Sequence, residues 1–72
     1  MRCYLVDYGD DSFLVKANNK KEAKEKIWNE YYAEQAIEDK KNGYEPPRKS
    51  YLEVDLIENL FTRYNSDIVQ IN

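Results

Sequence analysis

The sequence predicts an α+β fold, in which one long helix covers one face of a small antiparallel sheet of three to four strands, in the order β-β-α-β-β. Residues 19–42 contain neither glycine nor proline and are rich in Ala, Glu, Lys and Gln, which favour helices. Two short apolar segments precede this stretch and two follow it, each too short to fold alone. A chain of 72 residues has enough material for one small core, so we expect residues 1–72 to form a single domain.

The first two strands are predicted over residues 2–8 and 13–17, where side chains of different polarity alternate. Residues 9–12 between them, Gly-Asp-Asp-Ser, are typical of a hairpin turn. The hairpin makes this pair antiparallel. The pattern leaves open which face of the first strand meets the helix, so an outward face rich in tyrosine remains one alternative.

After the helix, residues 51–57 have the clearest alternation of a half-buried strand. Residues 67–71 predict a short last strand, and residues 59–64 a short helical turn between the two. The side chains of the third strand that we expect to point toward the core are Leu52, Val54 and Leu56.

Both ends of the predicted helix have residues that are typical of helix termini. Asn19 is a good N-cap, with Glu22 at the position of a capping-box partner. Gly43 suits the left-handed conformation that follows many helices, and Pro46-Pro47 prevents its continuation.

The apolar side of the helix changes part-way along it. Ile27 and Tyr31 belong to one stripe, which we expect to pack on the sheet. Beyond Tyr32 the apolar residues lie on nearly the opposite side. They are Ala33, Ala36 and Ile37. Either the helix bends or ends near Tyr32 or residue 38, or another chain covers this second patch.

Catalysis and cofactor binding are not expected. The chain has no histidine, which removes the commonest general base and metal ligand, and it has no glycine-rich phosphate loop. The acidic cluster in the first hairpin, Asp7, Asp10 and Asp11, has the ligand type for a hard cation but not the spacing of a calcium loop. We therefore expect a solvated turn, no metal site and no enzyme.

Cysteine usage and hydropathy indicate the compartment. Cys3 is the single cysteine and cannot form a disulfide within the chain, which fits a reducing cytoplasm. We expect Cys3 to be a small buried side chain rather than a reactive thiol. No apolar run approaches the roughly 20 residues of a membrane span, and Met1-Arg2 leads directly into a strand rather than a signal peptide. The expected location is cytoplasmic.

The charge is unevenly distributed. A formal net charge of −3 is not that of a typical nucleic-acid-binding protein. Acidic residues dominate the second half of the predicted helix, where a basic site on another protein would attract them. Lysines gather before and at the helix start, interrupted by glutamates. The lysines that a nucleic-acid site would use are Lys16, Lys20, Lys21 and Lys24.

The N-terminal part of the chain resembles small proteins encoded by phages and mobile elements. The similarity lies in residues 4–8 and 13–23, a hairpin whose second strand ends in Val-Lys-Ala-Asn-Asn, before a helix that opens with Lys-Glu-Ala. DpnD/PcfM-like small proteins have a similar pattern. The resemblance implies a host-takeover or anti-defence factor, including the anti-CRISPR type, that binds and blocks a larger protein.

The leading functional hypothesis is a non-enzymatic protein-binding module, a phage or mobile-element inhibitor or adaptor that occupies a site on a larger host protein. Trp and Tyr are enriched at interface hot spots. The expected contact residues are Trp28, Tyr32 and Ala36, with electrostatic support from Glu30, Glu34, Glu38 and Asp39. The alternatives are a nucleic-acid-binding module that uses the four lysines, with sheet tyrosines stacked on bases, and a structural homodimer that uses Ala33, Ala36 and Ile37.

Overall fold

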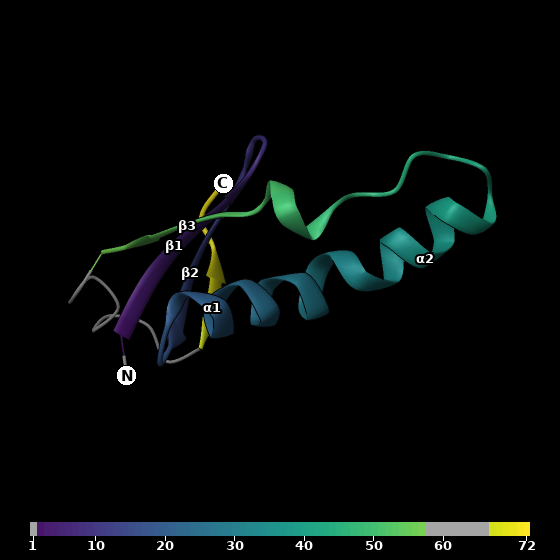
Figure 1. Ribbon diagram of the computed structural model, residues 1–72. Helices are drawn as coiled ribbons and strands as arrows, with labels where there is room; N and C mark the ends of the chain where they lie inside the picture. The colour runs from purple at the N-terminus through teal and green to yellow at the C-terminus, as the bar shows by residue number, and fades with distance from the viewer. Residues whose placement is uncertain (1, 58–66) are drawn as a thin grey trace.

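The computed structural model of the protein describes residues 2–57 and 67–72, and within them four strands form one antiparallel sheet with a long helix across one face (Figure 1). The order of the strands across the sheet is β3-β1-β2-β4. The predicted α+β class is confirmed. The elements are β1 (Arg2–Tyr8), β2 (Asp11–Ala17), α1 (Lys20–Ile27), the π-helical segment η1 (Trp28–Tyr32), α2 (Ala33–Lys41), the 3-10 turn η2 (Lys49–Tyr51), β3 (Glu53–Leu56) and β4 (Ile68–Gln70).

The first hairpin is tighter than predicted. Tyr8 pairs with Asp11, so only Gly9 and Asp10 form the turn, and β2 begins two residues earlier than the sequence indicated. Gly9 adopts a φ of 57°, a left-handed conformation that glycine reaches without steric penalty. The antiparallel pairing of β1 with β2 confirms the predicted hairpin.

The other two strands add to opposite edges of this hairpin. β3 pairs antiparallel with β1, and β4 pairs antiparallel with β2. β3 is shorter than the predicted strand because residues 49–51 form η2, in which the Leu52 amide donates to the Lys49 carbonyl at 3.1 Å. The helical turn expected over residues 59–64 lies outside the described residues.

The helix begins and ends where the sequence indicated. The Asn19 side chain accepts a hydrogen bond from the Glu22 amide at 2.8 Å, which caps the first turn. Gly43 has a φ of 81°, and the Tyr44 amide donates to the Asp39 carbonyl at 2.8 Å. The chain is therefore helical from Lys20 to Lys41.

A π-helical segment accounts for the change of apolar face. In η1 the Ala33 amide donates to the carbonyl of Trp28, five residues earlier, so the turn holds one extra residue. The next buried side chain after Ile27 is consequently Tyr32, not Tyr31, which is 39% exposed. Tyr31 still packs on the sheet, with its ring centroid 4.4 Å from that of Phe13, but it lies at the edge of the core rather than inside it. The helix neither ends near Tyr32 nor stays α-helical through it.

The core lies between the helix and one face of the sheet. Its residues show which face of β1 meets the helix. Tyr4 and Val6 point toward the helix, whereas Cys3 and Leu5 contribute to an apolar cluster on the far face, so the tyrosines of β1 do not form an outward surface. Leu56 pairs with Tyr4 at the end of the sheet and remains 39% exposed. The buried residues of the main core are Tyr4, Val6, Phe13, Val15, Ala17, Ala23, Ile27, Tyr32 and Leu52.

The second half of the helix extends beyond the sheet as an arm, which we define as α2 together with the returning residues 42–48. Figure 1 shows α2 directed away from the sheet, with the following segment running back beside it to β3. α2 contains no buried residue. The molecule is accordingly elongated, with extents of 41 × 19 × 17 Å.

Candidate protein-binding surface

Aromatic rings fill the junction between the sheet and the arm. Tyr32 stacks on Tyr8 with ring centroids 4.6 Å apart, and the centroid of the Trp28 ring lies 6.2 Å from that of Tyr32. The row continues from Tyr8 to Tyr51, whose ring lies 5.9 Å from the guanidinium of Arg48. These rings connect the helix, the hairpin and the segment before β3.

Tyr32 is fixed by a hydrogen bond as well as by packing. Its hydroxyl donates to Asp11 Oδ2 at 3.0 Å. Burial raises the pKa of Tyr32, and the hydrogen bond to Asp11 and the negative charge of Asp11 raise it further by smaller amounts. The phenol therefore stays protonated and remains a donor at neutral pH.

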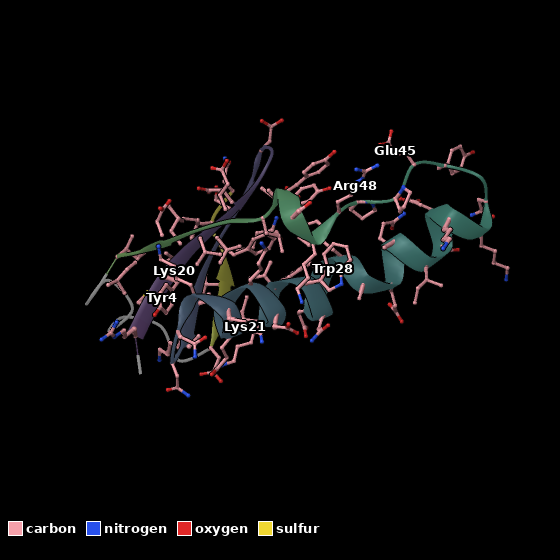
Figure 2. The ribbon with its side chains drawn as sticks, viewed as in Figure 1. Tyr4, Lys20, Lys21, Trp28, Glu45 and Arg48 are labelled. Atoms are coloured by element: carbon pink, nitrogen blue, oxygen red, sulfur yellow. The ribbon has the colours of Figure 1, made fainter. Side chains whose placement is uncertain are left out.

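The structure separates the two aromatic residues that the sequence placed at the binding surface. Tyr32 is only 9% exposed and belongs to the core, because the extra residue of η1 turns it toward the sheet. Tyr32 therefore offers little surface to a partner, and its contacts are within the protein. Trp28 is half-buried against the core and lies between the helix and the returning segment (Figure 2).

The outer face of α2 is the main exposed feature of the arm. Ile37 is 70% exposed, the highest value among the large apolar residues that the structure describes. Around it lies a shallow hollow whose lining comes from one helix face. The four lining residues are Glu34, Ile37, Glu38 and Lys41, which we call the outer face. Sequence analysis missed Lys41, although its spacing of four from Ile37 places it on the same side.

The acidic residues proposed as electrostatic support lie mainly on the outside. Glu30, Glu34 and Glu38 are exposed. Asp39 is half-buried and accepts a hydrogen bond from Gln35 Nε2 at 2.7 Å. Three of the four carboxylates are thus directed to solvent along one helix.

The three residues that the sequence suggested for a homodimer, Ala33, Ala36 and Ile37, differ in their exposure. Ala33 and Ala36 are half-buried, and so are Pro46 and Pro47 of the returning segment. Only Ile37 of that patch is largely exposed. Of the second apolar side, Ile37 is therefore the residue most accessible to another molecule, and it belongs to the outer face.

The lysines proposed for nucleic acid do not form one surface. Lys16 lies on the far face of the sheet, beside Cys3, whereas the other three are on the helix. Lys20 and Lys21 lie at the start of the helix, at the end of the molecule opposite the arm (Figure 2). Lys24, the last of the set, is half-buried.

Carboxylates neutralise other lysines near the helix start. Lys26 lies 3.5 Å from Glu22, and Lys49 lies 2.6 Å from Glu25. The hydrogen bond and charge of Lys49 lower the pKa of Glu25. The Glu25–Lys49 pair also ties η2 to α1 at the base of the returning segment.

The remaining polar candidates have structural partners. Asp7 accepts a hydrogen bond from the Ser12 hydroxyl at 2.6 Å, and Asp11 is held by Tyr32. Within residues 2–57 and 67–72, no group of three or more acidic, cysteine or histidine side chains has the arrangement of a metal site. Cys3 is buried as expected, and this burial raises the pKa of its thiol. None of the helices in the described part of the chain is both long and apolar enough to traverse a bilayer.

Comparisons with protein-family models, curated proteins and solved structures found no match. The resemblance of the first hairpin and helix start to phage proteins therefore stays an expectation from the sequence.

Proposed function

We propose that this protein is a non-enzymatic protein-binding module that attaches to a larger protein through its arm. The observation that carries the proposal is the complete absence of buried residues in α2, although the helix is well formed and well capped. The arm adds nothing to the core, so its sequence is free to serve recognition.

The energetics of the arm favour an external contact. Helices in proteins take most of their stability from the packing of an apolar face. α2 has nine residues and leaves Ile37 in solvent. A groove that received Ile37 would bury this side chain, worth about 1.5–3 kcal/mol, and would stabilise the helix as well.

The charge of the arm defines the chemistry of the partner. Glu30, Glu34 and Glu38 offer exposed carboxylates at intervals of four residues. A complementary site would have an apolar pocket for Ile37 with basic residues at its rim. Opposite charges would speed the encounter, and that effect would weaken as salt is raised.

The resemblance to phage proteins supports a more specific role. A small acidic protein of this origin would act as an inhibitor or adaptor by occupying a functional site on a host protein, as an anti-defence factor does. Trp28, half-buried at the base of the arm, would contact the edge of such a site.

A photo-crosslinking experiment in bacterial lysate tests the proposal. A photoreactive residue at position 37 should capture a larger protein, and the same residue at position 53, on an exposed part of the sheet edge, should not. The captured protein would then be purified and titrated with the untagged chain, with and without Glu34→Lys and Glu38→Lys.

The expected result is a binding constant weakened at least about tenfold by the double charge reversal, which corresponds to about 1.4 kcal/mol. The control is Glu53→Lys, which changes a charge of the same type away from the arm. Capture of the same proteins from positions 37 and 53, or binding that the arm variants leave unchanged, would reject the arm as the contact surface.

A further inference from the structure

The turn that ends α2 contains a chemically reactive pair, Asn42 followed by Gly43. It is the only place in the sequence where glycine follows asparagine. Both residues are exposed, and Figure 1 shows this turn at the tip of the arm, away from the sheet. Apart from its two chain neighbours, no described residue lies within 4 Å of the position that a Cβ on Gly43 would take. The backbone nitrogen of Gly43 is therefore open to close approach by a side chain.

An asparagine before such a nitrogen can lose its side-chain amide without an enzyme. The Gly43 nitrogen gives its proton to a base in the solvent and forms a bond to Cγ of Asn42. The bond from Cγ to Nδ2 breaks, and Nδ2 takes a proton from water and leaves as ammonia. Water then opens the resulting five-membered succinimide. Cleavage between nitrogen and Cγ gives aspartate, and cleavage between nitrogen and the backbone carbonyl carbon gives isoaspartate.

The folded arm holds this pair in a conformation that cannot close the ring. Asn42 has a ψ of 2°, which directs the Gly43 nitrogen away from the Asn42 side chain, so ring closure requires a large rotation of ψ. The Gly43 amide donates to the Lys40 carbonyl at 3.3 Å, and the Tyr44 amide donates to the Asp39 carbonyl at 2.8 Å. The rotation would break both of these capping hydrogen bonds.

We propose that Asn42 is a site of spontaneous deamidation, that opening of the last turn of α2 sets its rate, and that its conversion loosens the arm. α2 has no buried residue, so this turn can open without disturbing the core. A new carboxylate at the C-terminal end of α2 opposes the helix dipole, and isoaspartate also lengthens the main chain within the cap. The only co-reactant is water, so the inference goes beyond the proposed function.

Peptide mapping by mass spectrometry, on the whole chain aged at mildly alkaline pH, tests the site. Asn29 is the internal control, because it is exposed but is followed by Glu30. In buffer and in urea alike, Asn42 should react at least about tenfold faster than Asn29, since a side chain on the next residue hinders the attack. Equal rates at the two asparagines in urea would overturn the assignment of Asn42.

Two comparisons test the role of the last turn. The wild-type rate at Asn42 should be at least about tenfold lower in buffer than in urea, where no helix restrains the pair. Lys40 is exposed, and Lys40→Gly and Lys40→Ala remove the same charge but differ in how well they keep the turn helical. In buffer the glycine variant should react at least about threefold faster than the alanine variant, and in urea the two should be equal. Equal rates in buffer, or no difference between buffer and urea, would show that the turn does not control the reaction.

The effect on the arm is measured on the deamidated chain, separated from the fresh chain by its additional negative charge. Its α2 amides should exchange hydrogen at least about threefold faster than those of the fresh chain. Asn42→Gln, aged in parallel, should keep the exchange of the fresh protein, because glutamine would have to form a larger ring. Unchanged exchange in the deamidated chain would overturn the loosening of the arm. None of these measurements involves a partner, so the result is independent of the crosslinking test.

Discussion

Tyr32 is the residue that joins the sheet, the helix and the arm. Its ring stacks on Tyr8 from β1, and its hydroxyl reaches Asp11 at the start of β2. It is also the last buried residue of the helix before the arm begins. A buried phenol needs a hydrogen-bond partner for its hydroxyl, and the Tyr32 hydroxyl finds a carboxylate acceptor at the edge of the core.

Removing the hydroxyl of Tyr32 should destabilise the protein. Tyr32→Phe keeps the ring contacts and loses the bond to Asp11 Oδ2, so the free energy of unfolding should fall by about 1–2 kcal/mol in urea denaturation. Tyr31→Phe is the matched control, because the Tyr31 hydroxyl makes no hydrogen bond with a described residue, and its effect should stay within about 0.5 kcal/mol. Equal effects of the two variants would mean that the bond to Asp11 contributes nothing.

The same residue should make stability depend on alkaline pH. In the folded protein the pKa of Tyr32 lies above the value of about 10 that a phenol has in the unfolded chain. The folded state therefore holds its proton more tightly, and this contribution is complete below about pH 10 and is lost as the pH rises further. Between pH 9 and pH 11, wild-type stability should decline more steeply than that of Tyr32→Phe. Parallel curves for the two proteins would contradict the shifted pKa.

At the scale of elements, η1 is the turn that an α-helix would form if one residue were inserted into it. Ile27 and Tyr32 both face the core but are five residues apart, where an α-helix would require four. Asn29 and Glu30, within the widened turn, are both exposed. The extra residue of this segment is thus accommodated on the solvent side of the helix, not against the sheet.

Deleting Asn29 should remove the π-helical turn and leave the core intact. Tyr32 would then follow Ile27 at a spacing of four, and the arm would keep its relation to Tyr32. We expect urea denaturation to show a stability equal to the wild type within about 0.5 kcal/mol, or higher.

Deleting Lys24 is the control for this experiment. That deletion changes the spacing between Ala23 and Ile27, both fully buried in α1, and should cost about 2–5 kcal/mol through lost core packing. If the two deletions destabilise the protein equally, the core packing requires the π-helical turn, and the turn is not simply one extra residue.

At the scale of the whole molecule, packing is concentrated at one end. The sheet, α1 and Tyr32 hold the buried residues, whereas the arm is attached through the helix and through the returning segment. The returning segment is tied at its base by the Glu25–Lys49 pair and by the bond from the Arg48 amide to the Tyr8 hydroxyl. Local stability should follow this division.

Hydrogen exchange at low micromolar concentration should reveal the division directly. Backbone amides of α2 should exchange at least about 100-fold faster than those of α1 and the central strands, because α2 can open without disturbing the core. Addition of a partner that binds the arm should slow exchange in α2 selectively. Uniform protection along the whole helix would show instead that the arm opens only together with the core.

Local sequence signals determined much of this protein. Alternation located β1 and β3 approximately, Asn19 and Gly43 marked the helix ends, and the order of elements followed from the chain. These features depend on neighbouring residues and on backbone preferences, which a sequence pattern records. The change of apolar side beyond Tyr32 was also visible as a pattern.

Only the tertiary structure decided what that change means. Five-residue spacing in η1 brings Tyr32 rather than Tyr31 into the core, because Tyr8 and Asp11, distant in sequence, receive its ring and its hydroxyl. The face of β1 that meets the helix was likewise settled by packing across the sheet. Ala33 and Ala36 are half-buried whereas Ile37 is exposed, and no helical pattern contains that distinction.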